Sequence, residues 1–141
     1  MTELRIRVPG TPVPMARARI TKFGNYNKKE MREYKEIVKQ TAAVAMKQQD
    51  VFQAPAGIPI SVELLVCVRH PTGTKKGIER TIQPFIKRPD LDNYVKLALD
   101  ALQDVVYPDD GAVWDIRARK LRVPPGEQSL EITVRFDVEN D

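Results

Sequence analysis

The sequence predicts a small α/β domain of the α+β type, with a four-stranded mixed sheet and two helices in the order β-α-β-α-β-β. Apolar and polar residues alternate in four segments, as they do in half-buried strands. In two other segments apolar residues recur every three or four positions, as in amphipathic helices. The length of 141 residues and the 42% hydrophobic content suit one core, so we expect a single domain over residues 1–141.

The first half of the chain is expected to hold a strand, a helix and a second strand. Residues 4–8 alternate apolar side chains with arginine and end at a Pro-Gly pair, which predicts a strand. Asn27 and Glu30 form a capping pair, and a helical apolar period then runs to about Gln48. Residues 60–68 alternate as well, and their second face is partly apolar. That pattern favours a central place in the sheet.

The second half is expected to hold one helix and two strands. A helical apolar stripe spans residues 91–106 and closes at Tyr107-Pro108. Residues 113–123 predict the next strand. Residues 130–138 alternate most regularly of all and predict the last strand.

Composition excludes several classes of function. No apolar run approaches the roughly 18 residues of a membrane helix, and the N-terminus lacks the apolar core of a signal peptide, so we expect a cytoplasmic protein. Cys67 is the only cysteine, which rules out an internal disulfide and a cysteine-based zinc site, and we expect it to be a buried bystander. His70, the only histidine, has no identifiable partner and is assigned no function, which argues against serine or cysteine hydrolase chemistry.

Two connections, residues 9–26 and 70–89, are longer than a compact domain usually needs, and both are basic. Glu79 is the lone acid across the two, within a chain of net charge +4. One interpretation is that these loops are charged only because they are exposed to solvent. We favour nucleic-acid binding, because basic loops neutralise phosphates and interspersed aromatics stack on unpaired bases. The residues predicted to bind nucleic acid here are Arg17, Arg19, Lys75, Lys76, Lys87 and Arg88.

The first of the two C-terminal strands is also basic. Alternation places Arg117 and Arg119 on the face opposite Trp114 and Ile116. A cationic outer face, with Lys120 close by, fits a phosphate-binding edge. An edge strand charged to prevent sheet association explains the pattern equally well.

Carboxylates gather before and after the second predicted helix. In the stretch KRPDLDNYVK, Asp90, Asp92 and Asn93 together exceed what one helix start can use, since a single N-cap aspartate satisfies it. Asp109-Asp110 follows the helix in YPDDG, which on its own indicates a turn. A helix over residues 91–106 separates the two groups by some 24 Å. They meet only if the chain doubles back.

The type of ligand indicates which ion such a cluster would bind. Oxygen ligands without histidine or cysteine select Mg²⁺ or Mn²⁺ over zinc. A calcium EF-hand is excluded, because DLDNYVKLALDA lacks the glycine at its sixth position and the closing glutamate. Asp92, Lys96 and Asp100 share one polar stripe of the helix. Lys96 is therefore either a cation for a phosphate or an intrahelical ion-pair partner worth about 0.2–0.5 kcal/mol.

The run PDLDNYVKLALDALQDVVYPDDGAVWDIRARK, about a quarter of the chain, resembles the core signature of the RusA family of Holliday junction resolvases. It joins a D-x-D-N start, a lysine four residues after the second aspartate, an Asp-Ala-Leu on the same helix, an Asp-Asp pair and a basic strand. The resemblance implies a bacterial or phage-encoded homodimer that cuts branched DNA with Mg²⁺, or Mn²⁺ as a substitute. By that resemblance Asp90, Asp92 and Asp110 are the metal-holding catalytic acids and Lys96 the essential lysine.

Two departures from the family pattern bear on substrate choice. Gly111-Ala112 stands where many members have serine or alanine then glutamine, and the N-terminal loop is not a close match. Loops select among junctions, flaps and duplex, so the preference among them stays open. The alternative function is a non-catalytic branched-DNA-binding protein, a decayed resolvase whose aspartates serve only as caps.

Overall fold

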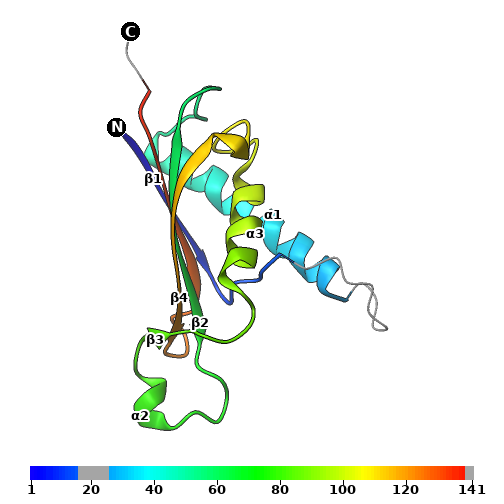
Figure 1. The fold of residues 1–141 in the computed structure, drawn as a ribbon, viewed down its shortest axis with the longest axis vertical. Helices are drawn as coiled ribbons and strands as arrows, with labels where there is room; N and C mark the ends of the chain where they lie inside the picture. The colour runs from blue at the N-terminus through cyan, green and yellow to red at the C-terminus, as the bar shows by residue number, and fades with distance from the viewer. Residues whose placement is uncertain (16–25, 139–141) are drawn as a thin grey trace.

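This computed structural model describes residues 1–15 and 26–138 (Figure 1). Its strands are β1 (Thr2–Pro9), β2 (Ile60–Arg69), β3 (Gln83–Pro84), β4 (Val113–Val123) and β5 (Ser129–Phe136). Its helices are α1 (Tyr26–Gln49), α2 (Lys76–Glu79) and α3 (Leu91–Leu102), with a short 3-10 helix η1 (Asp110–Ala112).

The strands form one mixed sheet in the order β1-β5-β2-β4-β3. Only β2 and β4 pair in parallel, and β2 is central, as predicted. The predicted α+β class is confirmed, but the count of four strands and two helices is wrong, because α2 and β3 lie in the connection 70–89. Elements of four and two residues are too short to show a hydrophobic period.

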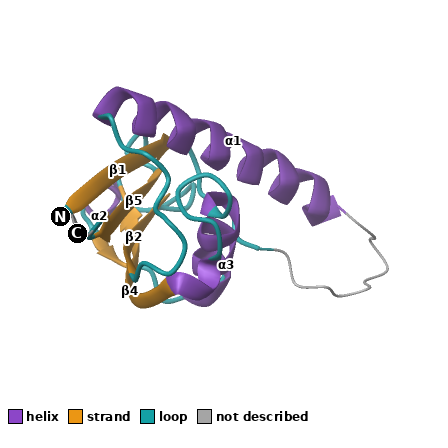
Figure 2. Ribbon diagram, turned by 90° about the horizontal axis from the view of Figure 1, so that it is seen from above, coloured by secondary structure: helices purple, strands orange, loops and turns teal. Residues whose placement is uncertain are grey.

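Helices α1 and α3 lie on the same face of the sheet (Figure 2). Cross-strand register aligns Leu4 with Val134 and Val134 with Val62, so one apolar face runs across β1, β5 and β2. All three side chains are buried, and the apolar stripes of α1 and α3 pack against them. No helix among the described residues is long and apolar enough to cross a bilayer.

Helix α3 ends at Leu102, four residues earlier than the apolar stripe predicts. Asp104 adopts a left-handed backbone with φ of 66°, and its N–H donates to the Tyr107 carbonyl at 2.7 Å. This turn carries Val106 and Tyr107 into the core, where both are fully buried. The two residues belong to the core as their hydrophobicity suggests, but they reach it through a turn.

Three smaller predictions also have outcomes. Cys67 is buried, as expected, with 6% of its surface exposed. His70 is buried too, and its Nε2 lies 2.8 Å from the Thr81 carbonyl oxygen, which is a structural role. The last strand was predicted to reach Val138, but β5 ends at Phe136, so Val138 lies beyond the observed strand and is half exposed.

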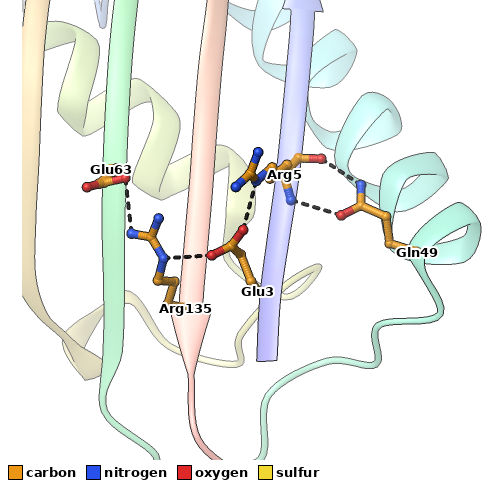
Figure 3. A network of polar contacts seen from close by, with 5 residues as sticks. All are labelled: Glu3, Arg5, Gln49, Glu63 and Arg135. Atoms are coloured by element: carbon orange, nitrogen blue, oxygen red, sulfur yellow. Dashed lines mark hydrogen bonds and ion pairs between the residues drawn. The ribbon is translucent and has the colours of Figure 1, made fainter. Parts of the chain in front are cut away.

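A side chain from α1 covers part of the outer edge of β1 (Figure 3). The Arg5 N–H donates to Gln49 Oε1 at 3.0 Å, and Gln49 Nε2 donates to the Arg5 carbonyl at 2.7 Å. An unpaired strand edge is a template for association with another chain. Gln49 therefore protects this edge.

The face of the sheet away from α1 and α3 carries a network of charged side chains (Figure 3). Arg135 Nε donates to Glu3 at 2.9 Å, and its Nη1 lies 3.0 Å from Glu63. Arg5 Nε also donates to Glu3, at 2.7 Å. The hydrogen bond from Arg135, followed by that from Arg5, lowers the pKa of the Glu3 carboxyl below its ordinary value of 4.5.

The substitution Glu3→Gln is expected to reduce stability slightly at pH 7 and not at all in strong acid. Because the folded-state pKa is depressed, the contribution of Glu3 is present above about pH 4.5 and is lost as pH falls through the lower folded value. Urea unfolding of both proteins at pH 7 and pH 3 measures the difference. An equal difference at the two pH values would contradict this assignment.

Candidate active site

The start of α3 presents two aspartates. Asp90 is the N-cap residue, with an extended backbone (φ −69°, ψ 146°), yet its side chain makes no capping hydrogen bond. Asp92 lies in the first helical turn with 63% of its side chain exposed. Capping therefore does not explain either carboxylate, although capping is the usual reason for an aspartate at this position.

Lys96 lies one turn after Asp92 on the same exposed face. Its Nζ is 3.9 Å from the Asp92 carboxylate, and its side chain is 65% exposed. An exposed i,i+4 pair at this distance contributes little to stability. Asp100 differs, because it lies 2.5 Å from Lys35 of α1 and links the two helices. Of the predicted polar stripe, Asp92 and Lys96 are the more exposed, while Asp100, with 45% of its side chain exposed, is held by Lys35.

Asp110 lies at the opposite end of α3. Its backbone N–H donates to Oε1 of Gln103, the residue that follows the helix, at 3.1 Å. The 12 residues of α3 span about 18 Å at 1.5 Å per residue. Strand β4 does return toward the start of α3, but Asp110 precedes that strand. In the part of the chain that the structure describes, no three acidic, histidine or cysteine side chains gather closely enough to hold one ion.

The neighbouring acids have structural partners. Asp109 Oδ1 accepts the Gly111 N–H at 3.1 Å, which makes Asp109 the cap of η1. Asp115 Oδ2 accepts the Ser61 hydroxyl at 2.8 Å across β2 and β4. These bonds assign both residues to the scaffold, and Asp110 is exposed beside them.

What the returning strand brings to the start of α3 is Lys120. Its Nζ donates to the carbonyls of Lys87 at 2.5 Å and Pro89 at 2.6 Å, and lies 4.2 Å from the centre of the Phe85 ring. Burial lowers the pKa of this ammonium group, and nearby Asp90 acts in the opposite direction. Lys120 thus holds the segment that leads into Asp90. It was predicted only to bind nucleic acid, and this structural role was not foreseen.

The substitution Lys120→Met keeps the length of the side chain and removes its donors. We expect the free energy of unfolding to fall by about 1.5–3 kcal/mol, the range for hydrogen bonds to a charged group. The neighbouring variant Arg119→Met loses the same charge from an exposed position and is expected to stay within about 0.5 kcal/mol of wild type. Urea denaturation measures both. Equal stabilities for the two variants would show that Lys120 does not hold this segment.

The predicted nucleic-acid-binding residues divide between two surfaces. Lys75 and Lys76 begin α2, which lies at the lower end of Figure 1, while Lys87 and Arg88 precede Asp90, and all four are exposed. Arg117 and Arg119 are exposed on the other face of the sheet, where β4 pairs them with Glu63 and Leu65 of β2. Arg17 and Arg19 lie outside the described residues.

Sequence reasoning missed a pocket that adjoins Asp90. It has a volume of about 610 Å³, and its wall includes Asn93, Arg122 and Phe85. Arg122 lies two residues after Lys120 in β4, so strand alternation already placed it on the same face. Asn93 follows Asp92 directly, but nothing in the sequence indicates where its side chain points.

Comparison with known proteins gives two matches. The family described as Endodeoxyribonuclease RusA matches residues 9–135. The uncharacterized protein YqaN of Bacillus subtilis (strain 168) is 26% identical over 137 residues, which cover 94% of this chain and 95% of that protein. The region matched by the family includes α3 and the acids at both of its ends.

Proposed function

Because the chain belongs to the RusA endodeoxyribonuclease family, we propose that it is a Mg²⁺-dependent endonuclease that resolves Holliday junctions or related branched DNA. The family match over residues 9–135 is the observation that carries this proposal. The acids at the start of α3, half-buried Asp90 and exposed Asp92, follow closely after the basic pair Lys87 and Arg88 and are consistent with it. A phosphate drawn by the basic pair would lie beside these acids.

The proposed metal ligands are Asp90, Asp92 and Asp110. Carboxylate oxygens suit Mg²⁺, with Mn²⁺ as a substitute. A single chain keeps Asp110 about one helix length from the other two, so the site requires a homodimer. If two copies pack with their α3 helices antiparallel about a two-fold axis, Asp110 of the partner subunit comes to the end where Asp90 and Asp92 lie.

Two features of β4 support such a dimer. Among the described strands, β4 pairs on its outer side only with β3, at Leu121 and Arg122, so the rest of that edge is open. Trp114 and Ile116 near its start are 74% and 42% exposed. Antiparallel pairing of two β4 edges would also follow a two-fold axis. Large exposed apolar side chains beside an open edge are typical of an interface.

The roles of the residues follow from the charge of the reaction. A divalent ion in this site would stabilise the negative charge of the phosphoryl oxygens and activate a water molecule. Lys96 would place a fixed cation beside the scissile phosphate or the leaving oxygen. The exposed basic residues Lys75, Lys76, Lys87 and Arg88 would neutralise flanking phosphates without reading the sequence.

Incubating the protein with a synthetic four-way junction, with and without Mg²⁺, tests the proposal. We expect paired nicks at symmetric positions with Mg²⁺ or Mn²⁺ and none with a chelator. An intact junction that is only shifted in a gel, under saturating Mg²⁺, would contradict the enzyme and favour a DNA-binding role without catalysis.

A further inference from the structure

The pocket beside Asp90 has the size and composition of a ligand site. Its volume of about 610 Å³ lies within the roughly 300–1,000 Å³ typical of small-molecule pockets. Val13 and Met15, after β1, and Tyr94 of α3 supply apolar wall, and Asn93 and Arg122 supply polar groups. Asp90, a proposed metal ligand, is part of the same wall. A molecule bound here would adjoin the reaction site.

Arg122 forms a fixed platform in this pocket. Its guanidinium carbon lies 3.8 Å from the centre of the Phe85 ring, and its Nη1 donates to the Arg69 carbonyl at 2.9 Å. These two contacts hold the guanidinium group in place before any ligand arrives. Guanidinium planes and aromatic rings are the surfaces on which proteins stack unpaired bases.

Asn93 supplies a polar side chain to the wall of the pocket. Only 9% of its surface is exposed, and its backbone is already used, because its N–H donates to the Asp90 carbonyl and its carbonyl accepts the Met15 N–H. Its side-chain amide makes no hydrogen bond among the described residues, and Asn93 lines the pocket. A carboxamide offers a donor and an acceptor side by side, which matches the edge of a nucleobase.

We propose that this pocket receives one unpaired nucleobase from the DNA strand whose backbone passes Asp90, with Arg122 stacking on the base and Asn93 bonding to its edge. The inference rests on the proposed function. It explains why a stacking platform and a bonding amide adjoin the site of cleavage. Removing a base from its stack costs least where pairing is already disturbed, so the pocket favours branch points over intact duplex.

The test combines a pocket-filling variant with DNA that lacks one base. Thr11 is exposed and lines the pocket, so Thr11→Trp fills the pocket without disturbing the core. Gln48→Trp adds the same side chain to an exposed position on α1 and serves as the control. All variants carry Asp92→Asn, so that junctions are bound without being cut. Four-way junctions with a single abasic nucleotide, moved one position at a time past the cleavage site, are titrated by fluorescence anisotropy.

At one position the abasic nucleotide is expected to weaken junction binding roughly tenfold, both in the protein that carries Asp92→Asn alone and in the Gln48→Trp control. Thr11→Trp should weaken binding of the complete junction by a similar factor and show no further loss with the abasic one. Asn93→Leu should likewise weaken binding of the complete junction, through the base at that same nucleotide position. If the loss of junction binding caused by Thr11→Trp simply adds to the loss caused by the abasic nucleotide at every position, no base enters the pocket.

Failure of the two proposals can be told apart. If the wild-type protein cuts junctions and the effects are additive, only the base pocket is wrong. If the wild-type protein neither cuts nor binds junctions, the proposed function is wrong and the pocket assignment falls with it. Thermal unfolding of each variant, followed by circular dichroism, identifies any variant that has failed to fold.

Discussion

Replacing Asp92 by asparagine is expected to reduce junction cleavage by about 10³-fold or more while leaving junction binding as tight as in wild type. Asparagine has the same size but lacks the negative charge that a divalent ion needs. A metal site supplies several kcal/mol of transition-state stabilisation, and each 1.36 kcal/mol is tenfold in rate. Stability should hardly change, because the ion pair of Asp92 with Lys96 is exposed and 3.9 Å long.

The matched control is Asp50→Asn. Asp50 is also exposed, and asparagine tolerates its left-handed backbone with φ of 55°. Single-turnover cleavage and gel-shift titration of both variants separate chemistry from binding. Cleavage by Asp92→Asn at the rate of Asp50→Asn would remove Asp92 from the site.

The second large effect is expected for Lys96→Met, which should lower the cleavage rate by roughly 10²–10³-fold, the loss typical of one electrostatic group at a developing charge. The alternative role of Lys96, an intrahelical pair with Asp92, predicts instead a change of only about 0.2–0.5 kcal/mol in stability and none in rate. Rate and stability therefore distinguish the two roles.

Lys47→Met is the control for Lys96→Met, since Lys47 is an exposed lysine near the end of α1. Cleavage is measured with saturating protein, so that weaker DNA binding does not lower the rate. If Lys96→Met cleaves as fast as Lys47→Met under these conditions, Lys96 takes no part in the reaction.

Much of the fold could be predicted because strands and long helices have a regular spacing of apolar residues in the sequence. The bounds of β4 match the predicted strand at both ends. The end of α3 could not be predicted, because Val106 and Tyr107 are as apolar as a continuing helix requires. Only the left-handed turn at Asp104 reveals that they reach the core differently. Elements α2 and β3 were missed because short polar segments carry no period.

The candidate site divides in the same way. Asp90, Asp92 and Lys96 are neighbours on one helix, so local geometry alone places them together. The position of Asp110 depends on how the chain returns after α3, which spacing does not fix. The holding role of Lys120 and the stacking of Arg122 on Phe85 depend on contacts across some 30 residues or more, and no local pattern predicts such contacts.

The shared site can be tested most directly by mixing two inactive variants, Asp92→Asn and Asp110→Asn. If Asp90 and Asp92 of one protomer act with Asp110 of the other, a mixed dimer contains one site with both substitutions and one intact site. Random mixing makes half of the dimers mixed, so about a quarter of wild-type sites should regain nicking activity. A mixture as inactive as either variant alone, in dimers shown to have exchanged, would contradict a site built from both protomers.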